Sequence, residues 1–367
     1  MINVAHGYGF TTGTCAAGAA RAAAQGLAVG SVPDSVEVVT PSGITAKLRI
    51  LEKTLNPGHS ASCAVKKDAG DDPDVTHGCL VFARVEPCPE KGVAINGGEG
   101  VGTVTKPGLR VAPGEAAINP VPRNMIRESV KKFMRRDTGL RVTVSVPGGE
   151  EIAEKTFNPR LGILGGISII GTTGIVRPMS QESHKVSLVC ALDVASAMGH
   201  ETVVLVPGNL GENAFLRTFK VPAEQVVQIS NYLGFMLVEA KKKGFPRIIL
   251  AGHPGKLAKF IRGDLDTHSL KSPPAMDIVI KILEENGLEE SIVGAIKDSP
   301  TVEGIIQRLR ERDKLFMMGN IADIIEGKAR EFLGSKMDMG VVLFDMQMDV
   351  IGISKGAKGW QKGLQIA

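Results

Sequence analysis

A glycine-dense apolar stretch at residues 161–180 constrains the fold of this chain more than any other segment. Its sequence, LGILGGISIIGTTGIVRPMS, holds five glycines and has no charged residue before Arg177. Glycines at this density allow one backbone to lie against another, or a ligand to lie on the main chain. The apolar residues predict burial, whereas Thr172 and Thr173 predict a polar contact, which we expect at a cleft between two domains. A second Thr/Gly segment, residues 10–14, is expected to pair with this one.

Length and composition indicate a folded protein of two domains. The chain has 367 residues, and its 43% hydrophobic content can form a large core. The longest apolar run is interrupted by threonines before it reaches the length of a membrane span, and the N-terminus lacks the pattern of a signal peptide. Five cysteines without CxxC spacing are typical of free thiols in a reducing cytoplasm and argue against a zinc site. We therefore expect a cytoplasmic protein without a membrane segment or a metal of its own.

The charge balance favours a small anionic ligand over nucleic acid. The net charge is +4 and the isoelectric point is about 8.7, a mild basic excess. Only 4% of the residues are aromatic, so stacking platforms for bases are scarce.

An alanine-rich run, CAAGAARAAAQGL, predicts a helix from Thr14 to about Gly26 that packs closely against a neighbour. Thr11 and Thr12 come just before it. Backbone N–H groups at a helix start, together with hydroxyl groups, form an anion site. The alternative is that a threonine only caps the helix, and the sequence leaves both open.

Carboxylates crowd the segment KKDAGDDPDVT, residues 66–76. Clustered carboxylates repel one another, so one of them, such as Asp72, can hold a proton and act as a general base, and a hard metal ion is also conceivable. The alternative is a solvated Asp/Pro turn. Elsewhere, KTLNP at 53–57 and KTFNP at 155–159 hint at two related β units, and NGGEGVG at 96–102 is weak evidence for a phosphate-binding loop.

The pattern of predicted secondary structure changes near Pro178, and after it strands and helices alternate. Residues 202–206 and 247–251 are continuous apolar strands, and helical patterns lie between and after them. This alternation predicts a parallel, doubly wound α/β sheet. We place an α+β domain at residues 1–182 and a Rossmann-like domain at residues 183–367.

Two loops are expected at the carboxyl edge of that sheet, where ligands bind in such folds. The first follows Val206 and offers Gly208, Asn209, Gly211 and Glu212 to a cofactor, although it is not a GxGxxG motif.

The second loop, residues 252–256, looks like a P-loop but lacks its spacing and its Ser or Thr, so ATP hydrolysis is disfavoured. Around it, His253, Lys256 and His268 are as consistent with a site as with structural roles. No arrangement for nucleophilic catalysis is apparent.

These segments resemble one family from end to end. It is the CbiD family, the cobalt-precorrin-5B (carbon-1)-methyltransferases of anaerobic cobalamin biosynthesis. The resemblance rests on six motifs that occur in the same order: GYGFTTGTCAAGAARAA, KKDAGDDPDVT, GGEGVGTVTKPGL, AINPVPRNMI, KTFNPRLGILGGISIIGTTGIVRPMS and GHPGKLAKFIRGDLDTHS.

The resemblance implies a methyl transfer from S-adenosyl-L-methionine to ring carbon 1 of a cobalt-bound, ring-contracted tetrapyrrole. Cobalt then travels in the substrate, and the protein needs no metal site. The implied fold is an α+β first domain of the ribosomal S5 second-domain type and a Rossmann-like second domain. Other enzymes of the cobalamin pathway are possible partners, and the sequence does not give the oligomeric state.

Site residues follow from this chemistry as hypotheses. Methyl transfer is an in-line displacement that depends mainly on positioning, and a base is needed if the macrocycle loses a proton. The candidate bases are His253, Asp72 and His268. The candidate partners of the substrate carboxylates are Thr11, Thr12, Thr14, Lys66, Thr172, Thr173, Arg177 and Lys256.

Two rival functions stay open at this point. One is a small-molecule phosphoryl-transfer enzyme, and the other is a corrinoid-binding protein without catalytic activity.

Overall fold

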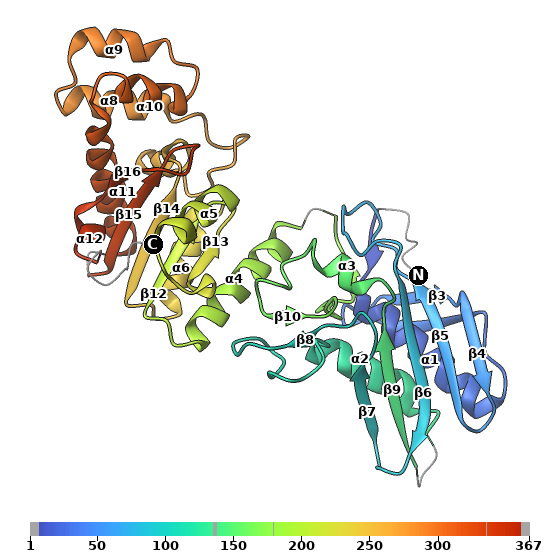
Figure 1. Ribbon diagram of the computed structural model, residues 1–367. Helices are drawn as coiled ribbons and strands as arrows, with labels where there is room; N and C mark the ends of the chain where they lie inside the picture. Colours follow the sequence, from blue (N-terminus) through green and yellow to red (C-terminus); the bar gives the residue numbers. More distant parts are fainter. Residues whose placement is uncertain (1–6, 135–137, 179, 335, 361–367) are drawn as a thin grey trace. The chain divides into compact units, whose positions relative to one another are not determined.

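The computed structural model of the chain divides into two compact units, residues 1–183 and 184–367 (Figure 1). It describes residues 7–134, 138–178, 180–334 and 336–360. Each unit has its own sheet and its own core.

Unit 1 is built on a five-stranded mixed sheet. Neighbouring strands are antiparallel except for β7, which runs parallel to β9. A separate two-stranded hairpin stands beside it. The sheet order is β4 (Glu52–Asn56), β5 (Ser60–Lys66), β6 (Leu80–Cys88), β9 (Gly139–Ser145) and β7 (Val93–Gly97), and the hairpin pairs β2 (Ser35–Val39) with β3 (Thr45–Arg49).

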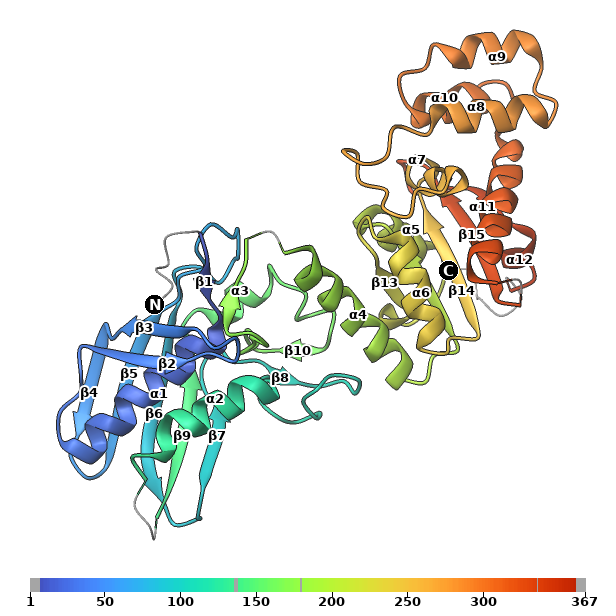
Figure 2. The ribbon, with the colours of Figure 1, turned by 180° about the vertical axis from the view of Figure 1, so that it is seen from behind.

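Two helices cover one face of this sheet, as Figure 2 shows: α1 (Thr12–Val29) and α2 (Pro120–Lys131). The alanines of α1 from Ala16 to Ala24 are at most 1% exposed. Because alanine has almost no side chain, α1 lies close to β5, β6 and α2 at once. The predicted close packing of this helix is confirmed, and the helix extends beyond the predicted bounds at both ends.

The glycine-dense stretch at 161–180 forms two very short β-strands, and each pairs with another short strand of unit 1. Its residues pair through β10 (Ile163–Leu164) with β8 (Thr103–Val104) and through β11 (Ile175–Val176) with β1 (Gly9–Phe10). Its apolar residues Ile167 and Ile169 are at most 1% exposed. The predicted burial holds for only part of the stretch, because Leu164 and Ile170 are 54% and 50% exposed.

Hydrogen bonds join this stretch to the start of α1, as the paired Thr/Gly segments predicted. The Thr14 hydroxyl donates to the carbonyl oxygen of Gly174 at 2.7 Å. The Gly13 N–H donates to the carbonyl of Ile170 at 2.9 Å, and the Ile170 N–H donates to the Thr12 hydroxyl at 2.9 Å. The two segments therefore fix one another across more than 150 residues of sequence.

The glycines of NGGEGVG serve close backbone packing. A Cβ atom on Gly100 would lie 1.9 Å from the carbonyl oxygen of Val146, and its φ is +68°. A Cβ on Gly149 would likewise lie 2.2 Å from the oxygen of Gly100. The weak indication of a phosphate-binding loop is explained by these contacts between backbones.

The carboxylate-rich segment at 66–76 is fastened by a buried lysine. Lys67 is 2% exposed, and its ammonium group donates to Asp74 at 2.7 Å. Burial alone raises the pKa of the Asp74 carboxyl, but hydrogen bonds from Lys67 and Thr76 outweigh it and hold that pKa below its ordinary value of 3.8. The segment is thus more than a solvated turn.

The two KT(L/F)NP copies do not form related units. Residues 53–57 lie in the edge strand β4 and its turn, whereas residues 155–159 follow the short helix α3 (Gly149–Ala153). There Asn158 is buried and its amide donates to the carbonyl of Gly166 at 3.0 Å. The suggested repeat is wrong, because the two similar sequences adopt different backbone conformations.

Unit 2 is built on a five-stranded sheet in which four strands are parallel and the last is antiparallel. The predicted strands 202–206 and 247–251 match two of its central strands within one residue. The sheet order is β13 (Val226–Gln228), β12 (Thr202–Val206), β14 (Arg247–Gly252), β15 (Asp338–Phe344) and β16 (Val350–Ile353).

Helices lie on both faces of this sheet. Strand order reverses at β12: α5 (Asn209–Thr218) leads outward to β13, and α6 (Leu233–Lys242) leads back past β12 to β14. Right-handed crossovers place such helices on opposite faces. Phe215 of α5 shares a core cluster with Ala357 of α12 (Lys355–Lys358), while α6 contacts α11 (Met318–Leu333).

Among the other helices of unit 2, α4 lies before β12 and a group lies between β14 and α11. Figure 1 shows α8, α9 and α10 clustered together beyond the sheet. Their bounds are α4 (Gln181–Ala197), α7 (Pro254–Leu257), η2 (Ala258–Arg262), α8 (Met276–Glu285), α9 (Glu290–Lys297) and α10 (Val302–Arg310).

We predict that Gly100→Ala destabilises the protein far more than Gly58→Ala. Both glycines have positive φ, +68° and +77°, but nothing lies within 4 Å of a Cβ built on Gly58. The strained φ alone costs about 1–2 kcal/mol, and overlap with Val146 should add about 2–3 kcal/mol for Gly100. Urea unfolding of both variants measures the difference. Equal losses would show that the close approach at Gly100 relaxes freely.

We also predict that the contribution of Asp74 to stability is lost in acid. Because its folded pKa lies below 3.8, the contribution is complete above that pH and disappears as the pH falls through the lower, folded value. The free energy of unfolding of wild type should therefore exceed that of Asp74→Asn at neutral pH and approach it as the pH is lowered below 3.8. Urea unfolding of both proteins over a pH series measures this. A wild-type advantage that is independent of pH contradicts this account.

The Lys67→Met variant tests the same pair from the other side. It leaves the partly buried Asp74 without its cation, and it should lose about 3 kcal/mol of stability at neutral pH. The loss should shrink in acid, where Asp74 is protonated and no longer needs a counter-ion.

Candidate functional site

The carboxyl ends of the parallel strands β12, β13, β14 and β15 meet at one edge of the sheet of unit 2. Loops that follow parallel strands are therefore neighbours there, and a crevice opens where the strand order reverses. In this sheet the reversal lies between β12 and its neighbours β13 and β14. The polar side chains of these loops form the candidate site of unit 2.

The turn after β12 and the first turn of α5 carry the four residues expected to bind a cofactor. Gly208 precedes α5, and Gly211 packs so closely that a Cβ on it would lie 3.1 Å from the carbonyl oxygen of Ala251. Asn209 and Glu212 both accept from the amide of Gln228, each at 2.7 Å. Gln228 ends β13, so its amide fastens the end of that strand to the first turn of α5.

The loop after β14 does not form a phosphate-binding loop. Residues 254–257 make only one helical turn, α7, and His253 caps it. The Lys256 ammonium donates to the Asn231 side chain at 3.2 Å. Burial lowers the pKa of Lys256, and the nearby charge of Lys259 lowers it further.

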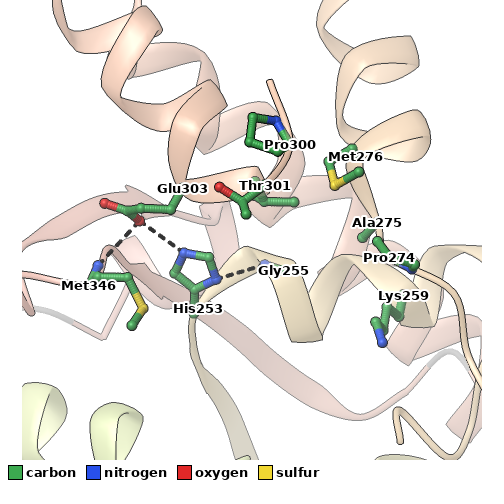
Figure 3. A pocket seen from close by; sticks show the side chains of 11 residues that line it. His253, Gly255, Lys259, Pro274, Ala275, Met276, Pro300, Thr301, Glu303 and Met346 are labelled. Carbon is green, nitrogen blue, oxygen red and sulfur yellow. Dashed lines mark hydrogen bonds and ion pairs between the residues drawn. The ribbon is translucent and has the colours of Figure 1, made fainter. Parts of the chain in front are cut away.

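A pocket of about 440 Å³ lies beside His253, between the end of β14 and the helices α8 and α10 (Figure 3). This volume is within the range of small-molecule sites. Its polar side chains are His253, Lys259, Thr301 and Glu303, and the rest of its lining is mostly apolar. The apolar lining comes from Pro274, Ala275, Met276, Pro300, Val302 and Met346.

Both ring nitrogens of His253 are engaged. Nδ1 accepts from the Gly255 N–H at 3.0 Å, and Nε2 lies 3.0 Å from the Glu303 carboxylate. A nitrogen that accepts from an N–H carries no proton itself, so the proton of the neutral ring is on Nε2 and is donated to Glu303. His253 therefore has no free nitrogen to accept a proton from a substrate in this arrangement.

His268 lies in an exposed loop and does not line the pocket. Its Nδ1 accepts from the Leu270 N–H at 3.2 Å, and its own backbone N–H donates to Asp266 at 3.1 Å. Asp266 is also paired with Lys271 at 2.6 Å. The structure thus does not bring His268 together with His253 in one pocket.

In unit 1, Thr11, Thr12 and Thr14 are only 8%, 3% and 0% exposed. Their hydroxyls bond one another and the stretch 168–174. Thr11 also accepts from the Thr14 N–H, which is the capping role. The expected anion site at this helix start is wrong, because the protein itself uses the donors.

The other expected substrate contacts of unit 1 are exposed. Lys66, Thr172, Thr173 and Arg177 lie at the surface, and Asp72 is half-buried. Arg177 directly follows β11, which pairs with β1.

Strand β1 in turn adjoins the acidic segment. The Phe10 N–H donates to the carbonyl of Asp68 at 2.7 Å, and Tyr8 bridges to Gly70. Three segments distant in sequence, near residues 8–10, 66–72 and 172–177, are therefore joined in unit 1.

Three residues of the unit 2 edge were not singled out from the sequence: Gln228, Lys259 and Glu303. Gln228 is a polar residue that ends a buried strand, a signal that is visible in the sequence. Lys259 is 7% exposed and donates to the carbonyls of Thr267 and Ser272. Glu303 lies 50 residues beyond His253 in a helix, and no pattern in the sequence links the two.

Within the described part of the chain, no three His, Cys, Asp or Glu side chains are grouped to hold a metal ion. A search of the same residues for a helix with the length and apolar character of a membrane span finds none.

Comparisons with known proteins agree with the motifs. The CbiD family model matches residues 3–178, and the model of the CbiD C-terminal domain matches residues 266–355. A cobalt-precorrin-5B C(1)-methyltransferase of Thermoanaerobacter sp. (strain X514) is 43% identical over 94% of both chains. Another from Photorhabdus laumondii is 41% identical, over 95% of this chain and 92% of the relative.

Among solved structures, the cobalamin biosynthesis protein (cbiD) from Archaeoglobus fulgidus matches with 31% identity and a TM-score of 0.38. The match covers 70% of this chain and 81% of that one. On the strength of the family models and of relatives that match nearly end to end, this chain belongs to the CbiD family.

Proposed function

We propose that this protein methylates carbon 1 of cobalt-precorrin-5B, giving cobalt-precorrin-6A in cobalamin biosynthesis. The observation that carries the proposal is that relatives named cobalt-precorrin-5B C(1)-methyltransferase are 40–43% identical over at least 94% of this chain. We propose S-adenosylmethionine as the methyl donor, and cobalt as part of the substrate. A cytoplasmic location accords with a substrate made inside the cell.

We further propose that the two units are the two domains, with a boundary near residue 182. The strand order of unit 2, with one reversal at β12, supports a Rossmann-like domain. The sheet of unit 1, covered on one face by α1 and α2, supports a domain of the ribosomal S5 second-domain type.

The methyl donor is proposed to bind at the carboxyl edge of unit 2. Gly208, Asn209, Gly211 and Glu212 would hold its adenosyl part, and Gln228 keeps Asn209 and Glu212 in place. The adjacent apolar pocket would take the methionyl end.

The donor supplies a methyl group on a sulfonium, which reacts by in-line displacement. The chain then has to position two molecules, and no protein nucleophile is needed. Since both nitrogens of His253 are engaged, we propose that it holds Glu303 and the α7 turn in place, and that Asp72 or His268 accepts any proton that the macrocycle loses.

The substrate carries many carboxylates, and exposed cations suit them. We propose Lys66 and Arg177, with the hydroxyls of Thr172 and Thr173, as its partners in unit 1, and Lys256 as a further partner in unit 2. Thr11, Thr12 and Thr14 are left out of this set because they are buried and bonded.

The central experiment is incubation with labelled S-adenosylmethionine and the cobalt-precorrin pool, followed by mass measurement. One added methyl group is expected. ATP turnover without methyl transfer would instead favour the phosphoryl-transfer enzyme. Tight tetrapyrrole binding with an unaltered methyl donor would favour the corrinoid carrier.

We predict that Arg177→Gln raises the KM for the tetrapyrrole about tenfold and leaves kcat within about twofold, because a charge-assisted hydrogen bond to a carboxylate is lost. The affinity for the methyl donor should not change. Arg49→Gln, an exposed arginine of β3, is the matched control and should leave KM unaltered. A KM for Arg177→Gln equal to that of the control removes Arg177 from the substrate site.

We predict that one of two variants, Asp72→Asn or His268→Gln, lowers kcat by about 100-fold or more, the usual contribution of a general base. The same variant should lose the acidic limb of the pH–rate profile. His253→Gln is expected to weaken donor affinity without removing that limb. If both Asp72→Asn and His268→Gln keep wild-type rates and profiles, neither residue is the base.

A further inference from the structure

Lys256 and Asn231 meet at the carboxyl edge of the sheet of unit 2. Lys256 follows β14 and Asn231 follows β13, and β12 lies between these two strands. The Lys256 ammonium donates to Oδ1 of Asn231 at 3.2 Å. This hydrogen bond joins the loops on the two sides of β12, where the strand order reverses and where ligands bind in such sheets.

The ammonium of Lys256 makes no ion pair with a carboxylate in the described part of the chain. The side chain is half-buried, and its hydrogen bond goes to a neutral amide. Burial and the charge of Lys259, a second cation, both lower the pKa of Lys256. Lys259 itself donates to two backbone carbonyls, those of Thr267 and Ser272. An ammonium in such surroundings is stabilised by an anion that binds beside it.

Asn231 offers a second hydrogen-bond donor next to that ammonium. Only an amide oxygen can accept from Lys256, so Oδ1 faces the lysine, and Nδ2 is the other end of the same amide group. Nδ2 has no partner among the residues that the structure describes, and it keeps accessible surface, unlike the buried unpaired atoms of unit 2 such as Nε2 of His200. Because Asn231 and Lys256 are both half-buried, a ligand can reach them from solvent.

The loop that carries Asn231 is held in place by the protein itself. The Ile229 N–H donates to the carbonyl of Val206 at 2.8 Å, and the carbonyl of Asn231 accepts from the Thr267 N–H at 2.9 Å. Ser230 has a φ of +52°, a left-handed conformation that costs a residue other than glycine about 1–2 kcal/mol. Strained conformations cluster at functional sites, and this one fixes the position of the Asn231 amide.

We infer that Lys256 and Asn231 form a binding site for a carboxylate group. Two N–H donors on neighbouring groups, one of them charged, match the two oxygens of a carboxylate. The inference rests on the proposed function and deepens it, because it adds Asn231 to Lys256 and names the group that the two residues bind. Both reactants carry carboxylates, the macrocycle on its side chains and the donor on its methionyl part, so the test separates these two sources.

The test measures the binding of two probes by calorimetry. Cobyrinic acid, a corrinoid with carboxylic acid side chains, represents the macrocycle, and S-adenosylhomocysteine represents the donor. Lys256→Met should weaken the binding of one probe about 10- to 100-fold, the usual contribution of a hydrogen bond to a charged group, and should leave the other within about twofold. The affected probe identifies the source of the carboxylate.

Two further variants separate a direct contact from a structural role. Lys256→Arg keeps a cation with N–H donors and should retain most of the affinity for the affected probe. Asn231→Asp has nearly the same shape but replaces the N–H donor by a carboxylate oxygen, so it should weaken that probe at least as much as Lys256→Met. Lys281→Met is the matched control, since Lys281 is an exposed lysine of α8, and it should bind both probes as wild type does.

Forms of the probes without the carboxylate complete the comparison. The methyl ester of cobyrinic acid, or the decarboxylated analogue of S-adenosylhomocysteine, should bind to wild type and to Lys256→Met with the same affinity. Thermal unfolding checks that each variant is folded, and Lys256→Gln replaces Lys256→Met if the latter is not.

Two results would overturn the inference. One is unchanged affinity of folded Lys256→Met for both probes. The other is an equal loss for a probe and for its form without the carboxylate, which shows that the lysine supports the loop and does not bind the ligand. Failure of the proposed function looks different, because wild type itself would then bind neither probe, and the inference would fall with it.

Discussion

The pocket of unit 2 depends on the attachment of α10 to the carboxyl edge of the sheet. Two polar contacts contribute to this attachment: Glu303 bonds His253 at the end of β14 and Met346 after β15, and Arg310 bonds Asp345, which is fully buried. The Glu303 contacts join α10 to strands that precede and follow it in sequence, and the Arg310 contact joins it to the end of β15. Loss of both would release the two ends of α10 from the strand ends, and the pocket would lose the wall that carries Glu303.

The sheet of unit 2 was predictable because its signal is local. A run such as TVVLV has none of the charged residues that a solvated face favours, so 202–206 is a strand buried on both faces. Glu303 was not predictable for the opposite reason. Its role comes from a contact across 50 residues, and an isolated glutamate in the first turn of a helix is ordinary. The same limit applies to Lys67, whose burial depends on how the 66–79 segment folds back.

The threonines at the start of α1 form a pattern that is consistent with two different roles, helix capping and anion binding. A Thr-rich helix start provides both caps and anion donors, and the sequence does not tell which is used. It did predict that this segment pairs with residues 171–174. That pairing is itself the reason why no anion site forms, because Gly174 and Ile170 take the donors of Thr14 and Gly13. The predicted pairing of the two segments is therefore correct, and it excludes the predicted anion site. This conflict becomes visible only when each hydrogen-bond donor is matched to its acceptor.

The two reactants of the proposed reaction carry opposite charges. This difference would explain why unit 2 has a carboxylate in its pocket and unit 1 has exposed cations. Under the proposed function, the donor is a cation at its sulfonium and its ammonium, and the substrate is rimmed with carboxylates. A single basic site would repel the donor, and a single acidic site would repel the substrate. Unit 2 has a carboxylate oxygen without a hydrogen-bond partner among its described residues, at Glu303, and unit 1 exposes Lys66 and Arg177. The Glu303 carboxylate bonds the His253 ring and the Met346 N–H, so these donors partly offset its charge toward a polyanion outside the pocket.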